Sequence, residues 1–254
     1  MKKIIILVFS LLITVGLSAC QGTVKEKNVV FNDTVLEAKV RTLLNKPTGD
    51  ITIAEVALIT DLNLYVDWAP QIPKETQIKN IEALKYFTGL KRLNMDFNAI
   101  SSIEPLKGLT NLIELDIGGN QISDISIVSN FKNLEQLKIY SNPLTDLSPI
   151  SSLTKLRMLH ADRGNYTDLS ALAKLTELTY LNIAFGAFTD ISVLSNLTKL
   201  EELYLNDVKL KSLQPLSGLT NLKVLKLANT GITDYQPIKA LYPNLKDKDF
   251  EITQ

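Results

Sequence analysis

The chain has 254 residues, in which 27 Lys and Arg balance 27 Asp and Glu, and 45% of the residues are hydrophobic. This composition is that of a globular protein with room for one or two domains, and the balanced charge argues against nucleic-acid binding, which needs a clustered excess of basic side chains. A single cysteine excludes an internal disulfide, a CxxC redox pair and a four-thiolate zinc site.

Residues 1–19 have the layout of a secretory signal peptide. Lys2 and Lys3 precede an apolar run from Ile4 to about Val15, and small residues follow it. The alternative, a membrane-spanning anchor helix, needs roughly 20 apolar residues. Polar and small residues interrupt the present run before it reaches that length, so the sequence favours the signal peptide.

The segment Leu17 to Cys20 resembles the lipoprotein signal of bacteria, a Leu-small-small-Cys box that is cut just before the cysteine. The resemblance implies that Cys20 is lipidated and begins the mature chain; the alternative is an ordinary signal peptide with an incidental cysteine. Residues 20–32 then form the lipidated cysteine and a polar tether. Two or more acyl chains would anchor the protein stably to the outer face of the membrane.

Residues 33–60 are expected to form a helical N-terminal cap. Asp33 or Thr34 can cap a first helix, and Pro47 and Gly49 end it. Its apolar residues recur on one face: Leu36, Val40, Leu43 and Leu44. A capping box from Thr52 to Glu55 predicts a second, short helix.

From residue 87 to residue 240 the sequence repeats at a fixed spacing of 22 residues, without a gap. The seven repeats begin at Phe87, Leu109, Phe131, Leu153, Leu175, Leu197 and Leu219. Their fourth and seventh positions are leucine in every repeat, and the ninth, fourteenth, seventeenth and twentieth positions are apolar. Because one unit cannot bury these side chains alone, the period predicts stacked repeats that share a core.

This pattern resembles the LxxLxxLxLxxN signature of leucine-rich repeats, and the 22-residue period resembles that of the internalin-type surface proteins of bacteria. The resemblance implies an α/β leucine-rich-repeat solenoid with a curved parallel β-sheet on its concave face, short 3-10 or irregular convex turns and an N-terminal helical cap.

Residues 61–86 are interpreted as a first atypical repeat with an insertion that contains Trp68. Residues 241–254 are interpreted as a C-terminal cap, in which Lys248, near a core position, is expected to stop strand pairing.

The later repeats depart from the family pattern at their twelfth position. It is asparagine in the first three repeats and differs in the last four: Asn98, Asn120 and Asn142, then Gly164, Gly186, Val208 and Thr230. In the family this asparagine satisfies backbone groups of the turn, so the last four turns need other partners. We expect Tyr166 and Phe188 to fill the gap beside Ala161; the alternative is neutral drift in packing.

Aspartate recurs at the sixteenth position of five repeats: Asp124, Asp146, Asp168, Asp190 and Asp234. In-register aspartates can form a calcium ladder, or they can cap the convex turns. One aspartate per repeat lacks the additional oxygen ligands that calcium requires. The sequence therefore favours capping, and predicts no metal and no cofactor.

The outward positions of the strands form the candidate binding face. Tyr140, His160 and Tyr180 shift by two positions from strand to strand and so predict a diagonal. The predicted partner-binding residues are Tyr140, Met158, His160, Asp162, Tyr180, Asn182, Phe185 and Tyr204. Such side chains on a rigid sheet are typical anchors of recognition; the alternative is that they are scattered surface aromatics without a role.

The resemblance to internalin-type proteins implies a membrane-anchored extracytoplasmic binding module on the bacterial cell surface. Its concave face would recognise a protein, a peptide or a glycan, and no nucleic acid. The alternative is a structural or accessory spacer subunit of an envelope complex. An enzyme is disfavoured, because the adjoining outward positions offer His160 and Asp162 no serine or cysteine nucleophile.

Overall fold

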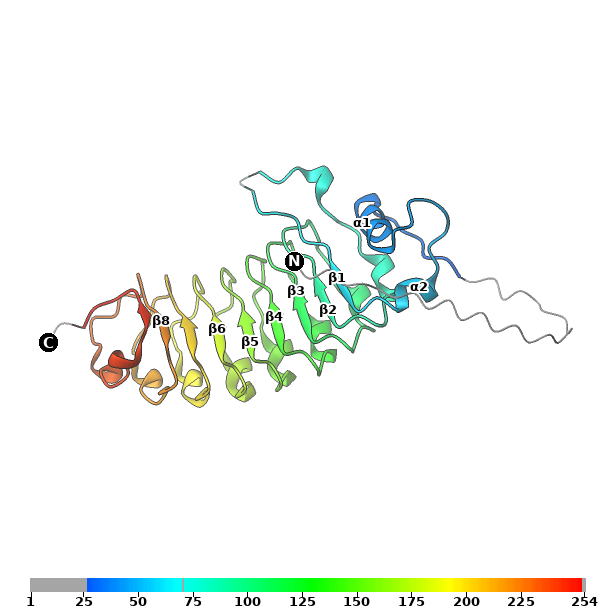
Figure 1. Ribbon diagram of the computed structural model, residues 1–254. Coiled ribbons are helices and arrows are strands. Elements are labelled where there is room, and N and C mark those ends of the chain that lie inside the picture. Colours follow the sequence, from blue (N-terminus) through cyan, green and yellow to red (C-terminus); the bar gives the residue numbers. More distant parts are fainter. Residues whose placement is uncertain (1–26, 70, 253–254) are drawn as a thin grey trace, which may run out of the picture.

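The computed structural model describes residues 27–69 and 71–252. The predicted signal peptide and Cys20 lie outside these residues. Within them, no helix has both the length and the apolar character needed to cross a bilayer. Figure 1 shows a row of strands with two α-helices at one end.

Helix α1 (Thr34–Leu44) begins where its sequence predicts. The Asp33 carboxylate Oδ1 accepts hydrogen bonds from the backbone N–H groups of Val35 and Leu36, both at 3.0 Å. Leu36 and Val40 are buried as expected. Leu43, expected on the same buried face, is instead 42% exposed and borders a hollow above strands β1 to β4.

Helix α2 (Ile53–Ala57) begins at the predicted capping box, in which Thr52 and Glu55 bond each other's backbone N–H groups. The helix packs closely on the first repeat. A Cβ on Gly89 would lie 2.3 Å from the carbonyl oxygen of Ala57, so only glycine permits this approach. The two helices thus cover the end of the core that the first repeat would leave open.

In the described residues the strands form one open parallel sheet, in which each strand pairs with its neighbours in the sequence. The strands are β1 (Asp61–Asn63), β2 (Arg92–Asn94), β3 (Glu114–Asp116), β4 (Gln136–Lys138), β5 (Met158–His160), β6 (Tyr180–Asn182), β7 (Glu202–Tyr204), β8 (Val224–Lys226) and β9 (Asp247–Lys248). From β2 to β8 each residue pairs with the residue 22 positions further on. The predicted period is therefore the register of the sheet.

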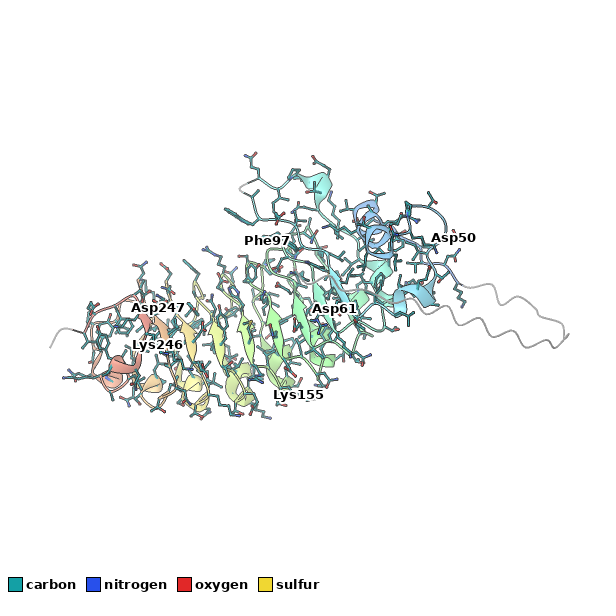
Figure 2. All side chains as sticks on the ribbon, viewed as in Figure 1. Asp50, Asp61, Phe97, Lys155, Lys246 and Asp247 are labelled. Atoms are coloured by element: carbon teal, nitrogen blue, oxygen red, sulfur yellow. The ribbon has the colours of Figure 1, made fainter. Side chains whose placement is uncertain are left out.

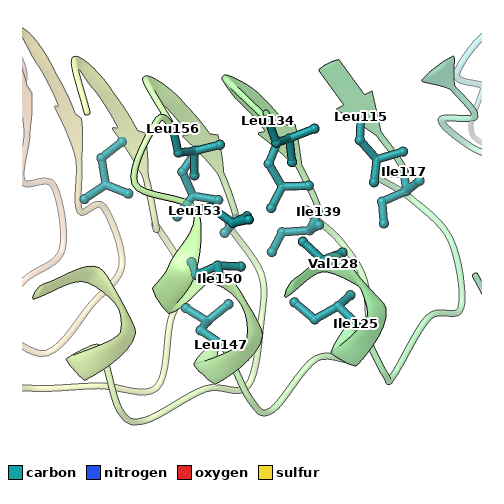
Figure 3. Close-up of a cluster of buried hydrophobic side chains, with 14 of the residues drawn as sticks. Leu115, Ile117, Ile125, Val128, Leu134, Ile139, Leu147, Ile150, Leu153 and Leu156 are labelled. Atoms are coloured by element: carbon teal, nitrogen blue, oxygen red, sulfur yellow. The ribbon is translucent and has the colours of Figure 1, made fainter. Parts of the chain in front are cut away.

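The convex side consists mainly of short 3-10 helices: Glu82–Tyr86, Glu104–Leu106, Ser126–Asn130, Ser148–Ser152, Ser170–Lys174, Ser192–Asn196, Gln214–Leu216, Gln236–Ile238 and Tyr242–Asn244. A further 3-10 helix, Lys74–Thr76, lies in the insertion after β1 on the side of α1 (Figure 1). The central residue of each strand is a buried leucine from Leu62 in β1 to Leu225 in β8. Figure 3 shows buried side chains on the strand side, such as Leu115, Leu134 and Leu156, above Val128 and Ile150 of the 3-10 helices. Each buried leucine contributes about 1.5–3 kcal/mol. This is the leucine-rich-repeat fold that the sequence predicts.

Strand β9, which contains Lys248, is the C-terminal edge of the described sheet, and no strand pairs beyond it, as expected. Lys248 lies in register with Leu225 of β8. Its ammonium group reaches outward over the ring of Tyr242, 4.6 Å from the ring centre, so the backbone can pair without burying the charge. Asp249 then caps the edge by accepting hydrogen bonds from the backbone N–H groups of Leu227 (2.7 Å) and Ala228 (3.2 Å).

Candidate functional site

The turns that support the first half of the concave face are held by buried asparagines. Asn120 accepts a hydrogen bond from the backbone N–H of Ile100 (3.1 Å) and donates to the carbonyl oxygens of Met95 (3.0 Å), Ile117 (3.1 Å) and Gly118 (3.0 Å). Asn98 and Asn142 repeat this arrangement in the neighbouring turns. These bonds join adjacent repeats and fix the backbone on which the face is built.

A tyrosine replaces the missing asparagine in the next turn. Tyr166 is buried, and its hydroxyl donates to the carbonyl oxygen of Ala161, the equivalent of the Met95 and Ile117 carbonyls. A Cβ on Gly164 would lie 2.2 Å from the Tyr166 ring, so the ring occupies the place of an asparagine side chain. Phe188 stacks on Tyr166 at 6.1 Å. The two aromatics fill the gap, as predicted.

The residue after each outward-facing strand segment adopts a left-handed backbone conformation. Its φ lies between 49° and 61° in Phe97, Gly119, Ser141, Arg163, Phe185, Asp207 and Asn229. Left-handed φ is unfavourable for bulky side chains and is concentrated at functional sites. Here it holds Phe97 and Phe185 at the rim of the concave face.

The predicted diagonal is a continuous chain of ring contacts, here called the aromatic row: Tyr140, His160, Tyr180 and Tyr204. Tyr140 and His160 stack with centroids 4.5 Å apart, His160 meets Tyr180 edge-on at 6.2 Å, and Tyr180 meets Tyr204 at 5.4 Å. The row crosses the sheet from β4 to β7. Contacting rings restrain one another, so the row presents a preformed surface.

Tyr140 is fixed at the N-terminal end of the row. Its hydroxyl donates to Asp96 Oδ2 at 2.8 Å, and its ring leans over Gly118, where a Cβ would lie 2.3 Å from the ring. Burial and then the hydrogen bond to Asp96 raise the pKa of Tyr140. Phe97 meets the Tyr140 ring edge-on at 5.9 Å and so extends the row onto the rim. In Figure 2, Phe97 lies below the loop that follows β1.

His160 at the centre of the row has two competing neighbours. Asp162 Oδ1 lies 2.7 Å from its Nε2, and Asn182 Nδ2 lies 3.0 Å from the same atom. The Asn182 amide is oriented by the backbone N–H of Ala184, which donates to its Oδ1 at 3.1 Å. The Asn182 amide forms the hydrogen bond with Nε2 of His160, whereas Asp162 Oδ1 is buried and has no hydrogen-bond partner among the described residues. His160 is therefore held in the row by Asn182.

The other predicted residues flank the row. Met158 is half-buried and pairs in register with Tyr180. Phe185 is 42% exposed, and the guanidinium of Arg163 lies 4.1 Å from its ring centre. Among the described residues Phe185 makes no ring contact with the aromatic row, so the structure places it beside the row rather than in it.

The prediction of binding residues missed Asp96, Asp116, Lys138 and Phe97. Asp116 and Lys138 form an ion pair at 2.5 Å on neighbouring strands, directly beside Tyr140. Their positions in the repeat could have identified these residues. Asp96, Asp116 and Lys138 occupy outward positions of the repeat, and Phe97 directly follows an outward position.

A hollow of about 380 Å³ lies at the N-terminal end of the concave face, between α1 and strands β1 to β4. Leu43 of α1 contributes to it, and Glu114 and Lys138 line its floor together with the ion pair of Arg92 and Asp61. Lys138 also borders Tyr140, so the hollow and the aromatic row are parts of one surface.

The recurring aspartates cap convex turns. Asp124 Oδ1 accepts the backbone N–H of Ser126 at 2.7 Å, which lowers the pKa of Asp124. The equivalent bond recurs at the other four positions: Asp146, Asp168, Asp190 and Asp234. Residues 27–69 and 71–252 contain no group of three His, Cys, Asp or Glu suited to a metal. The five hydrogen bonds confirm the capping interpretation.

Residues 88–130, 110–152 and 198–240 match the family model described as leucine-rich repeats (2 copies). The crystal structure of internalin C2 from Listeria monocytogenes is similar at a TM-score of 0.81 and 29% identity, over 89% of this chain and 98% of that chain. No curated protein matches the sequence.

Two more distant structures share the fold. A leucine-rich-repeat protein of Leptospira interrogans has a TM-score of 0.62 at 22% identity, over 78% of this chain and 62% of that one. The leucine-rich-repeat ectodomain of an Arabidopsis thaliana membrane receptor kinase was solved in complex with Casparian strip integrity factor 2. It has a TM-score of 0.61 at 19% identity, over 78% of this chain and 28% of that one. This fold is typically a non-enzymatic scaffold that binds proteins.

Proposed function

We propose that the protein is a membrane-anchored, extracytoplasmic binding module that recognises a protein partner with its concave face. The observation that carries this proposal is the aromatic row, in which contacting rings cross four neighbouring strands. Tyrosine is enriched among the residues that dominate binding energy at protein interfaces. The similarity to leucine-rich-repeat proteins supports a binding role, and the aromatic row supports the concave face as the binding surface.

The row is built for binding at low entropic cost. Its side chains are held by one another and by Asp96, so little rotamer freedom remains to be lost when a partner docks. At a strand spacing of about 4.8 Å, four strands give a row about 14 Å long. The proposed contact residues are Tyr140, Met158, His160, Asp162, Tyr180, Asn182, Phe185 and Tyr204.

The experiment is a capture from envelope extracts with residues 21–254, beside a variant with Tyr140→Ala, Tyr180→Ala and Tyr204→Ala. The matched control removes two exposed aromatics outside the row, Tyr65→Ala and Trp68→Ala. A partner held by the parent and the control but lost by the folded triple variant supports the proposal. Equal capture by all three, or capture by none, contradicts it and favours a spacer role.

The proposed anchor is tested separately at Cys20. We expect the full chain to incorporate labelled fatty acid in a bacterial host and to sediment with membranes. Cys20→Ser should abolish both, while Ser18→Ala, which keeps a small residue in the box, should retain them. Unchanged labelling of Cys20→Ser would refute the lipid anchor.

A further inference from the structure

Two aspartates beneath the end of the aromatic row are almost completely buried. Asp96 follows β2 and Asp116 ends β3, and each is 8% exposed. One oxygen of each carboxyl group has a donor: Asp96 Oδ2 accepts from the Tyr140 hydroxyl at 2.8 Å, and Asp116 Oδ2 accepts from Lys138 Nζ at 2.5 Å. The binding function proposed above leaves the remaining two oxygens unexplained.

The second oxygens, Asp96 Oδ1 and Asp116 Oδ1, are fully buried and have no hydrogen-bond donor among the described residues. Asn94 pairs with Asp116 in the register of β2 and β3, so Asp96, two residues further on, is the diagonal neighbour of Asp116 on the outward face. Two buried carboxylates in contact repel each other, and unpaired buried oxygens are costly. One proton resolves both problems, because it turns the contact into a hydrogen bond. Burial, and then the neighbouring Asp116, raise the pKa of Asp96 to about 8.

The surrounding charges compensate only one of the two carboxylates. From β4, Lys138 pairs with Asp116, and Tyr140 contributes a neutral donor. On the β1 side, the backbone N–H of Val66 donates to the Asp96 carbonyl, and its neighbours Tyr65 and Asp67 are exposed to solvent. Asp162, further along the face, adds a negative potential at Tyr140. The second carboxyl group therefore lacks a cation of its own.

We infer that Asp96 and Asp116 share one proton at neutral pH, and that this proton keeps the Tyr140 end of the binding face in place. When it leaves, the two carboxylates repel each other, and Asp96 moves away from Asp116 toward water. The Tyr140 hydroxyl stays bonded to the ionised Asp96, because a carboxylate is the stronger acceptor, so the Tyr140 ring moves with Asp96 and leaves its place in the row. Partner binding would then weaken at alkaline pH, a consequence that rests on the proposed function.

The shared proton is tested without a partner, in the full chain with ¹³C-labelled aspartate. The side-chain carboxyl resonances are followed from pH 3 to pH 10 and assigned with Asp96→Asn and Asp116→Asn. We expect Asp96 to titrate near pH 8, and Asp168, an exposed cap, to titrate below its usual range. Asp116→Asn should move the Asp96 transition to lower pH. Ionisation of both buried aspartates by pH 6 would overturn the inference.

Asp96→Asn mimics the protonated state, because its amide can donate to Asp116 Oδ1 at every pH. The folded pKa of Asp96 lies above the unfolded value near 3.8, so folded Asp96 holds a proton that the unfolded chain has lost. The Tm of the parent should therefore fall, relative to that of Asp96→Asn, as pH rises from about 4 to about 8, and then level off. Parallel Tm profiles of the two proteins would contradict the shared proton.

Capture at pH 6.5 and pH 9 separates this inference from the proposed function. If both hold, the parent releases most of its partner at pH 9 while Asp96→Asn retains it. Equal retention by the parent at both pH values would refute the coupling of the proton to binding. No capture at either pH, with the Asp96 titration observed near pH 8, would refute the proposed function and leave the shared proton standing.

Discussion

The first three repeats and the last four solve the same structural problem in different ways. In the first three, a buried asparagine bonds backbone groups of its own turn and of the preceding repeat. In the later repeats, the Tyr166 hydroxyl or the Thr230 hydroxyl reaches only the equivalent carbonyl of its own turn. The first half is therefore joined more tightly by polar bonds, whereas the second relies more on apolar filling. The aromatic row spans the boundary between them, with its first anchor, Asp96, on the asparagine side.

The largest expected effect is at Asn120. Asn120→Ala leaves the buried N–H of Ile100 without a partner and removes one of the donors to each of three carbonyl groups, so we expect a loss of about 4 kcal/mol in the free energy of unfolding. Thr230→Val is the matched change in the later region and should cost about 1 kcal/mol, since a single bond is lost. Urea denaturation measures both. Equal losses would remove the distinction between the two halves.

Restoring the asparagine in the later region should destabilise it. In Gly164→Asn the new Cβ would lie 2.2 Å from the Tyr166 ring, so we expect a cost of about 2–3 kcal/mol from overpacking. The double change Gly164→Asn with Tyr166→Val removes the ring and should recover much of that loss. A thermodynamic cycle over the four proteins measures the coupling. Additive effects would show that the ring does not occupy the place of the asparagine.

Much of the fold follows from the sequence, because the 22-residue period fixes which residues stack. Leu93 and Leu115 occupy the same position in neighbouring repeats, and they pair in the sheet. The contacts of the site are harder to predict. Tyr140 bonds Asp96, 44 residues away and two strands distant, because Gly118 leaves the intervening strand without a side chain. The repeat pattern does not predict that a side chain will cross a neighbouring repeat to form a hydrogen bond with the repeat beyond it.

The exception at the N-terminal end has a physical reason. Helical periodicity predicts a buried Leu43, yet Leu43 is 42% exposed and belongs to the cap, outside the seven regular repeats. Periodicity predicts burial only where stacking continues, and each end of a solenoid is closed by irregular contacts instead.

A smaller effect is expected when only the hydroxyl of Tyr166 is removed. Tyr166→Phe keeps the ring on Gly164 and its stack on Phe188, but leaves the Ala161 carbonyl without this donor. We expect a loss of about 1–2 kcal/mol, measured by thermal and urea denaturation. Phe188→Leu, which leaves this hydrogen bond intact, is the control for ring packing alone. A neutral Tyr166→Phe would mean that apolar filling alone replaces the asparagine.

The smallest effect is expected on the convex side, which has the same aspartate cap in both halves. Asp124 and Asp168 accept equivalent backbone hydrogen bonds, and these lower the pKa of each carboxyl group. A lowered folded pKa contributes stability above the unfolded value near 3.8, and this contribution is lost as pH falls through the folded pKa. Asp124→Ala and Asp168→Ala should therefore be slightly and equally less stable than the parent at pH 7, and the difference should shrink below about pH 4. Thermal melts across this range provide the measurement. A clearly larger effect at Asp168 than at Asp124 would show that the looser half depends on its convex caps, extending the contrast between the halves to both faces of the solenoid.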